Sequence, residues 1–250
     1  MSVLIVSAAC LVPARLPANP QNKSTLRVLC WNIHHGEGLD GKLDLPRIAA
    51  VILAAKPDVV ALQEVDQTTS RTGKVDQTAE LARLTGMKGV FGKAMDFGGG
   101  GYGQAILSKH PIQENQVHRL PGKGEPRIAF EAGIDVGGKL IRIVSTHLDL
   151  NPAQRLEQAK VLSGLFQKIT TPVILCGDFN DSPDSASLQE FRTWKPIPKL
   201  GDRATHPADK PTDEIDYFFT QNIDSIGRLN VLSESIASDH RPLLCEFDLP

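Results

Sequence analysis

Short apolar runs of strand length alternate with amphipathic stretches of helix length along most of the chain. Alternation of apolar and polar residues at every second position indicates a half-buried strand, and an apolar repeat of three to four residues indicates a helix. We therefore expect strands at residues 26–33, 59–65, 105–108, 129–135, 140–148, 173–177, 215–219 and 243–247. Helices are expected at residues 44–55, 76–86, 151–169 and 185–194. This ratio of strands to helices does not fit a strict βαβ repeat and predicts mixed β-sheets covered by helices.

Capping residues mark two of the expected helix starts. Asp44 stands before Pro46, and Asn151 directly precedes Pro152. The side-chain oxygen of such a residue accepts hydrogen bonds from free amides, and proline suits the first helical turn. The glycine-rich residues 98–103 and the loop at 121–126 are expected to be mobile surface connections. No linker of useful length divides residues 24–250, which are expected to form a single domain.

The N-terminal residues 1–23 are set apart from this pattern. Residues 3–12 form an apolar run of signal-peptide length, although no Lys or Arg precedes it as a secretory signal would require. We expect export to the periplasm or the extracellular space. The alternative is a disordered N-terminal segment on a cytoplasmic protein.

Composition and charge exclude several classes of protein. Hydrophobic residues make up 41% and charged residues 22% of the chain, which excludes a disordered protein. The 27 basic and 29 acidic side chains give a net charge of −2. There is no basic tail to attract nucleic acid or a membrane over a distance, although a nuclease is not excluded. Cys30, Cys176 and Cys245 lie in apolar runs without a CxxC motif, so neither a disulfide framework nor a zinc–thiolate site is expected.

Five of the predicted strands carry polar side chains on an otherwise aliphatic face, at what we take to be their carboxyl ends. By the two-residue period, Glu64 falls on the face of Val60 and Leu62. The other polar positions are Asn32 and His34, His147 and Asp149, Asp178 and Asn180, and Asp216. A charged group aligned with core residues is unfavourable unless it is paired or bound to metal. The simplest common explanation is one cleft in which these side chains converge around a cation.

The donor types indicate which cation and which chemistry. Oxygen donors dominate and no HExxH motif occurs, so Mg²⁺ or Mn²⁺ is favoured over zinc. His147 and His240 remain for proton transfer or for hydrogen bonds to a developing oxyanion. A hard metal with carboxylates and imidazoles suits hydrolysis of a phosphoester by in-line attack of an activated water.

Six short motifs in order carry a family resemblance. They read Trp31-Asn32-Ile33, Leu62-Gln63-Glu64-Val65, Ser145-Thr146-His147-Leu148-Asp149, Gly177-Asp178-Phe179-Asn180, Ile215-Asp216-Tyr217 and Ser238-Asp239-His240-Arg241-Pro242. This order resembles the endonuclease/exonuclease/phosphatase superfamily, which includes deoxyribonuclease I, exonuclease III, inositol polyphosphate 5-phosphatases and neutral sphingomyelinases. The resemblance covers residues 25–249. It implies a deoxyribonuclease I-like four-layer α/β (α+β) sandwich, with two packed mixed β-sheets flanked by helices.

The same resemblance implies roles for individual residues. Glu64 matches the principal metal ligand, assisted by Asn32 and Asp239. Asp178 and Asn180 would position the attacking water and the phosphate. His240 resembles the catalytic histidine, with Asp216 behind it, and His147 would donate a hydrogen bond to a phosphate oxygen. Asp178 and His240 are rival candidates for the general base. His34 stands where nuclease branches can carry an acidic metal ligand, and this departure argues against a second metal ion.

Two residues are candidates for contact with the substrate. Tyr102 lies in a YGNAILS-like segment and either borders the substrate or anchors the glycine-rich loop. Arg127 either clamps a phosphate or forms a surface ion pair. Overall the sequence predicts a metal-dependent phosphodiesterase, a nuclease first, that acts as a monomer without an obligate protein partner. The alternatives are a lipid-headgroup or inositol-phosphate phosphoesterase and, remotely, a non-catalytic module that binds a phosphorylated ligand.

Overall fold

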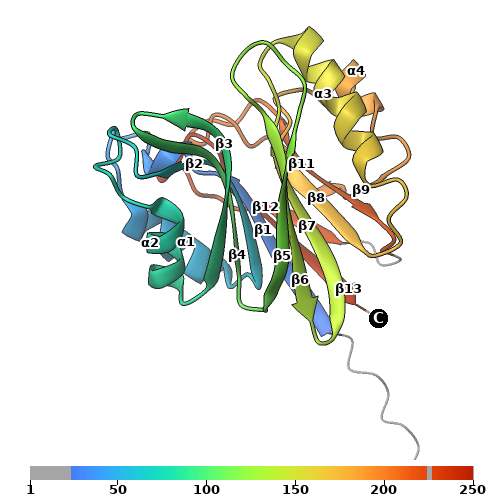
Figure 1. The fold of residues 1–250 in the computed structure, drawn as a ribbon, viewed down its shortest axis with the longest axis horizontal. Coiled ribbons are helices and arrows are strands. Elements are labelled where there is room, and N and C mark those ends of the chain that lie inside the picture. Colours follow the sequence, from blue (N-terminus) through green and yellow to red (C-terminus); the bar gives the residue numbers. More distant parts are fainter. Residues whose placement is uncertain (1–23, 224–226, 250) are drawn as a thin grey trace, which may run out of the picture.

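The computed structural model describes residues 24–223 and 227–249. Within them two β-sheets pack face to face, and helices cover the outer face of each sheet (Figure 1). This is the four-layer sandwich predicted above. The apolar run at residues 3–12, on which the expected export depends, lies outside the described residues.

Both sheets are mixed, as predicted. In spatial order, the first sheet contains β10 (Lys199–Leu200), β12 (Arg228–Val231), β13 (Leu243–Leu249), β1 (Ser24–Asn32), β2 (Val59–Gln67), β4 (Gly100–Ser108) and β3 (Lys88–Phe97). The second contains β5 (Ile112–Arg119), β6 (Ile128–Val136), β7 (Lys139–His147), β8 (Val173–Asp178), β11 (Asp216–Gln221) and β9 (Lys195–Pro196). The β1–β2, β7–β8 and β10–β12 pairs are parallel, whereas the other pairs are antiparallel.

Helices α1 (Leu45–Ala55) and α2 (Gln77–Thr85) cover the first sheet, and α3 (Pro152–Leu165) and α4 (Ala186–Gln189) cover the second. The predicted caps form: the Asp44 carboxylate accepts from the Arg47 amide, and the Asn151 side chain accepts from the amides of the first turn of α3. Because alternate strand residues face opposite sides, one set builds the apolar layer between the sheets and the other builds the two layers under the helices.

The pattern of apolar and polar residues does not predict several of the strands. Strand β5 has only two aliphatic residues and is largely exposed at the edge of its sheet, so no burial imposes an apolar alternation on it. The expectation that residues 98–103 form a mobile loop is wrong for most of them. Only Gly98 and Gly99 form the turn, and the chain from Gly100 onward pairs within β4. A Cβ at position 103 would lie 2.0 Å from the Gly92 carbonyl oxygen, so this glycine permits close strand pairing rather than mobility.

A buried ion cluster crosses three strands of the second sheet. Glu131 on β6 is only 4% exposed. Its carboxylate lies 2.7 Å from His118 Nε2 on β5 and pairs with the Arg142 guanidinium on β7. Burial alone would raise the pKa of Glu131, but the hydrogen bonds from His118 and Arg142 outweigh it and hold the pKa below its ordinary value. The ionised carboxylate therefore stabilises the folded state.

We expect Glu131→Gln to lower the free energy of unfolding at pH 7 by about 1–3 kcal/mol, because it removes the buried carboxylate that contacts His118 and Arg142. A depressed pKa means that this stabilisation is present above the unfolded value of about 4.3 and is lost as the pH falls through the folded value. The gap between wild type and variant in urea unfolding should therefore narrow from pH 5 to pH 3. The exposed Asp184→Asn is the matched control, and an equal gap at both pH values would contradict the assignment.

Candidate active site

The directions of the strands bring the predicted polar residues to one edge of the sandwich. Strands β1 and β2 are parallel, as are β7 and β8, and Asn32, His147 and Asp178 are the last residues of their strands. Strand β11 runs antiparallel to β8 and pairs Asp216 with Asp178. Asp216 is thus the first residue of its strand, so its predicted place at a carboxyl end is wrong. The antiparallel direction brings it to the same edge nonetheless.

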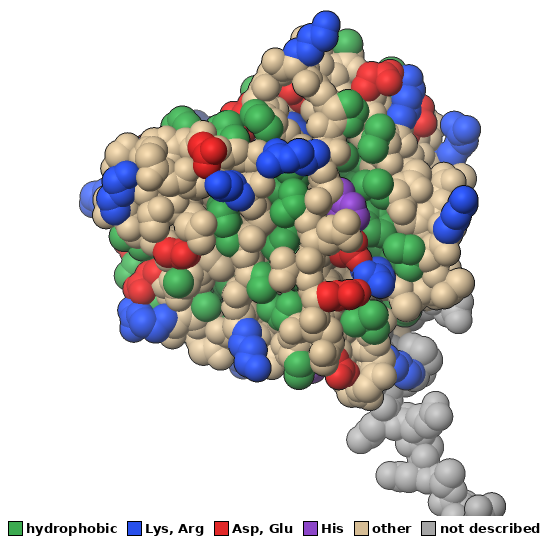
Figure 2. All heavy atoms as spheres, viewed as in Figure 1, with side chains coloured by type: hydrophobic (Ala, Val, Ile, Leu, Met, Phe, Trp, Pro, Cys, Tyr) green, Lys and Arg blue, Asp and Glu red, His purple; other side chains and the backbone are tan. Residues whose placement is uncertain are grey.

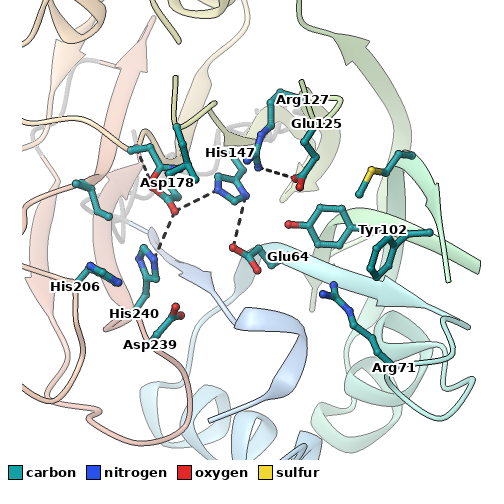
Figure 3. Close-up of a pocket in the computed structure, with 15 residues that line it drawn as sticks. Glu64, Arg71, Tyr102, Glu125, Arg127, His147, Asp178, His206, Asp239 and His240 are labelled. Atoms are coloured by element: carbon teal, nitrogen blue, oxygen red, sulfur yellow. Dashed lines mark hydrogen bonds and ion pairs between the residues drawn. The ribbon is translucent and has the colours of Figure 1, made fainter. Parts of the chain in front are cut away.

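A cavity of about 370 Å³ opens at this edge. Figure 3 shows carboxylates and imidazoles at one end of it and the Tyr102 ring, with Arg71 beside it, at the other. The predicted site residues that line it are Glu64, Tyr102, Arg127, His147, Asp178, Asn180, Asp239 and His240. Residues separated by up to 176 positions in the sequence therefore share one pocket.

Glu64 reaches the cavity through an irregularity in β2. The pairing of β2 with β4 shifts register between Leu62 and Val65, and Glu64 has a left-handed φ of 55°. Val65, rather than Glu64, packs with Val60 and Leu62 under the helices. The prediction that Glu64 shares their face is therefore wrong, because a bulge breaks the two-residue alternation and redirects the side chain.

A chain of buried groups runs through His240. Its Nδ1 lies 2.9 Å from Asp216 Oδ2, which also accepts a 2.6 Å hydrogen bond from the Thr205 hydroxyl. Its Nε2 lies 3.6 Å from Asp178 Oδ2. Asp216 is 2% exposed and lies behind the imidazole, as predicted for a residue that orients it. Thr205 was not predicted, because nothing in the sequence around it marks it.

The pKa values of these groups follow from burial and from neighbouring charges. Burial opposes protonation of His240, but Asp216 and Asp178 outweigh it and raise its pKa to about 10. Burial also raises the pKa of Asp178, to about 7, although the neighbouring His240 lowers it. For His147, burial and then the charges of Arg127 and His240 hold the pKa well below its ordinary value. His147 is therefore neutral and His240 charged at neutral pH.

The remaining predicted residues occupy distinct positions. Asn32 is 1% exposed and lies behind the cavity, where its amide nitrogen donates to Glu64 Oε1 at 3.0 Å and to Asp178 Oδ2 at 3.1 Å. Its nitrogen rather than its oxygen thus faces the carboxylates. Asn180 donates from its backbone to Asp178 and from its amide to the Leu148 carbonyl. Asp239 lines the cavity beside His240.

Both predicted substrate contacts lie in the wall of the cavity. Tyr102 is 7% exposed and belongs to β4 rather than to a loop. Arg127 is 8% exposed and pairs with Glu125 at 3.2 Å, while its Nε is buried without a hydrogen-bond partner. The expectation of a surface ion pair at Arg127 is therefore wrong in that the guanidinium is buried.

Arg71 and Phe97 extend this wall and were not predicted. The Arg71 guanidinium lies 4.6 Å from the centre of the Phe97 ring and 5.4 Å from that of Tyr102. Its Nε and Nη2 donate to the fully buried Asp66 carboxylate at 2.7 and 2.8 Å. Arg71 lies in a turn without hydrophobic periodicity, so only its spatial partners reveal it.

Three groups of described side chains could hold a metal ion, each with its possible ligand atoms within 4.8 Å of one another. They are His34 with His35 and Glu64, His206 with Asp239 and His240, and Asp178 with Asp216 and His240. The first of them includes His34, which the resemblance places where nuclease branches can carry an acidic ligand and which was expected to argue against a second metal ion. Carboxylates with imidazoles form a donor set that fits a divalent cation.

Figure 2 shows Lys and Arg side chains scattered over the visible face among acidic and apolar ones.

No helix within residues 24–223 and 227–249 is long and apolar enough to cross a membrane.

Comparison with known proteins agrees with this architecture. The model of the endonuclease/exonuclease/phosphatase family matches residues 29–240. The inositol phosphosphingolipids phospholipase C of Schizosaccharomyces pombe is 27% identical over 187 residues, which cover 63% of this chain and 42% of that protein. The chain thus matches less than half the length of this curated relative.

Two solved bacterial structures have the same fold. The endonuclease/exonuclease/phosphatase from Beutenbergia cavernae superposes with a TM-score of 0.73 at 25% identity, over 90% of this chain and 72% of that one. A family protein from Bacteroides thetaiotaomicron superposes with a TM-score of 0.74 at 20% identity, over 91% and 96% of the two chains.

Proposed function

The chain belongs to the endonuclease/exonuclease/phosphatase family, and from this premise we propose that it is a divalent-metal-dependent phosphodiesterase. The observation that carries the proposal is the buried Asp216–His240–Asp178 chain, which ends in a cavity beside Glu64. A charged imidazole next to carboxylates can neutralise a phosphate, and a carboxylate in reach can accept a proton from water.

In this proposal the residues of the cavity have distinct roles. His240, held charged by Asp216 and Asp178, donates a hydrogen bond to a phosphoryl oxygen. Asp178 takes the proton of the attacking water, and its position is fixed by the amide of Asn32 and the backbone of Asn180. We assign the base to Asp178 rather than to His240, because the Asp216 contact favours a proton on the imidazole. Neutral His147, whose ring lies between the carboxylates of Glu64 and Asp178, orients the phosphate.

The carboxylates of Glu64 and Asp239 would hold the divalent ion, for which the sequence favours Mg²⁺ or Mn²⁺. When bound, the ion supplies Lewis-acid stabilisation of the phosphoryl charge. Asn32 would join these ligands by turning its amide oxygen toward them. As the side chain now lies, it separates Glu64 from Asp178 through two donated hydrogen bonds and so keeps two carboxylates from repelling each other.

A lipid-headgroup phosphodiester is the substrate we propose, ahead of the nuclease substrate that the sequence favours. Two apolar side chains lie at the mouth of the cavity: Leu150 is 71% exposed and Phe97 is 38% exposed. Apolar side chains at a cavity rim suit contact with a lipid surface. The curated relative is by name a phospholipase C for phosphosphingolipids, and a net charge of −2 without a run of basic residues offers little attraction to nucleic acid.

We expect Glu64→Gln, Asp178→Asn and His240→Gln each to reduce hydrolysis of bis-p-nitrophenyl phosphate by at least about 100-fold, because each removes a group that stabilises the transition state. EDTA should abolish the activity, and an added divalent ion should restore it. His110→Gln is the matched control, since this residue follows β4 at the opposite edge of the sandwich. Full activity in EDTA would contradict the proposal.

The substrate proposal predicts which assay responds to the apolar rim. Exchange of Phe97 and Leu150 for Ser should lower the ratio of sphingomyelin-vesicle hydrolysis to bis-p-nitrophenyl phosphate hydrolysis about tenfold, because roughly 1–2 kcal/mol of apolar contact with the lipid is lost. Leu53→Ser, on the exposed face of α1, is the matched control. Plasmid DNA, RNA and phosphoinositides are assayed in parallel. Preferred hydrolysis of DNA or RNA would overturn the lipid substrate and support the nuclease.

A further inference from the structure

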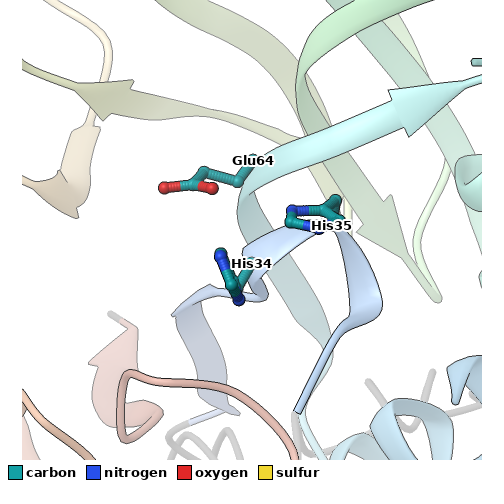
Figure 4. Close-up of side chains that lie close together, drawn as sticks. All are labelled: His34, His35 and Glu64. Carbon is teal, nitrogen blue, oxygen red and sulfur yellow. The ribbon is translucent and has the colours of Figure 1, made fainter. Parts of the chain in front are cut away.

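The turn after β1 presents two adjacent imidazoles to the carboxylate of β2. Residues His34–Gly36 form a short 3-10 turn in which His34 and His35 have left-handed φ values of 44° and 45°. Figure 4 shows both rings beside Glu64, which projects from the neighbouring strand. One possible ligand atom from each of the three side chains lies within 4.8 Å of the other two.

Glu37 determines which nitrogen of each imidazole is free. Its carbonyl oxygen lies 3.3 Å from His34 Nδ1, and a carbonyl can only accept, so Nδ1 carries the proton and His34 Nε2 keeps its lone pair. Its carboxylate lies 3.6 Å from His35 Nε2, which favours a proton there and a lone pair on His35 Nδ1. In metal sites, the second ring nitrogen of a ligating histidine is held by a carbonyl or carboxylate in this way.

Within the described residues, no donor forms a hydrogen bond with His35 Nδ1. His35 is 9% exposed, and its Nδ1 is buried without a hydrogen-bond partner. An unpaired buried polar atom destabilises the folded state by about 1–3 kcal/mol. A ligand that accepts this lone pair would remove that penalty. The nearby Arg71 guanidinium would repel a cation, but the fully buried Asp66 carboxylate pairs with it through two hydrogen bonds.

We propose that His34, His35 and Glu64 form a site for a divalent first-row transition ion such as Mn²⁺, Co²⁺ or Zn²⁺, in preference to Mg²⁺. Two imidazoles and one carboxylate suit such ions, whereas Mg²⁺ prefers oxygen ligands and its own waters. Three protein ligands leave coordination positions open, as in catalytic rather than structural sites. The inference rests on the proposed function, since Glu64 also lines the cavity and would place the ion at its edge.

Cobalt spectroscopy tests the site without reference to turnover. The full chain is stripped of metal with a chelator, freed of any affinity tag, and titrated with Co²⁺ while visible d–d absorption is recorded. We expect one equivalent to bind, at least roughly 100-fold more tightly than Mg²⁺ in competition. A wild-type protein that develops no d–d band, or that prefers Mg²⁺, would overturn the proposal.

Two variants each remove the ring nitrogen that carries the lone pair and keep a polar atom that can contact Glu37. His34→Asn retains a donor near the position of Nδ1 and lacks Nε2, and His35→Gln retains a polar atom near the position of Nε2 and lacks Nδ1. Each should weaken Co²⁺ binding at least roughly 100-fold without lowering the urea midpoint. His110→Gln should leave both measurements unchanged. Co²⁺ binding that survives in both variants would overturn the site.

Asp239→Asn separates this site from the Glu64–Asp239 arrangement in the proposed function. The Co²⁺ spectrum should persist in this variant, and its loss there alone would overturn the inference. Hydrolysis of bis-p-nitrophenyl phosphate is measured separately with Mg²⁺ and with Mn²⁺. A spectrum that needs both histidines in a protein without turnover would support the metal site and refute the hydrolase. Full turnover with Mg²⁺ and no histidine-dependent spectrum would refute the metal site alone.

Discussion

The carboxylate of Asp178 is buried at the end of a central strand, and the structure around it is arranged to satisfy that one group. It is 1% exposed and cannot rely on water. Donors therefore approach it from three directions: the Asn32 amide, the Asn180 backbone and the imidazoles of His147 and His240. An unpaired carboxylate here would be strongly destabilising. The constraint on folding thus assembles the groups to which the proposed function assigns hydrolysis.

The site and the core are parts of one layer. Along β8, Ile174 and Cys176 face the apolar space between the sheets, and Asp178 is the next residue on that face. Along β1, Cys30 is followed on the same face by Asn32. The layer between the sheets is therefore apolar up to Cys30 and Cys176, and the next residues on the same faces, Asn32 and Asp178, are polar. A rigid apolar layer below fixes where the polar side chains above it lie.

The sequence predicts the parts of the site that regular strands carry. Alternation alone aligns His147 with the core face of β7 and Asp178 with that of β8. The alternation fails at Glu64, because a bulge inserts a residue into β2 and no local sequence pattern predicts this bulge. It also fails for Arg71 and His206, which line the cavity from irregular segments where no period links position to orientation. Such residues become visible only through contacts distant in sequence.

Backbone strain is concentrated around the proposed site. Eight described residues other than glycine have a left-handed φ, and four of them, His34, His35, Glu64 and Asn180, surround the site. A left-handed residue other than glycine is unfavourable by about 1–2 kcal/mol, so these conformations persist only because neighbouring contacts impose them. At Glu64 the bulge points the carboxylate away from the helices and into the cavity. At the two histidines the turn brings a possible ligand atom of each ring within 4.8 Å of one on that same carboxylate. Both proposed metal arrangements therefore depend on Glu64. The contacts around β2 hold this residue in a left-handed conformation that is unfavourable for it and that places its carboxylate in the cavity.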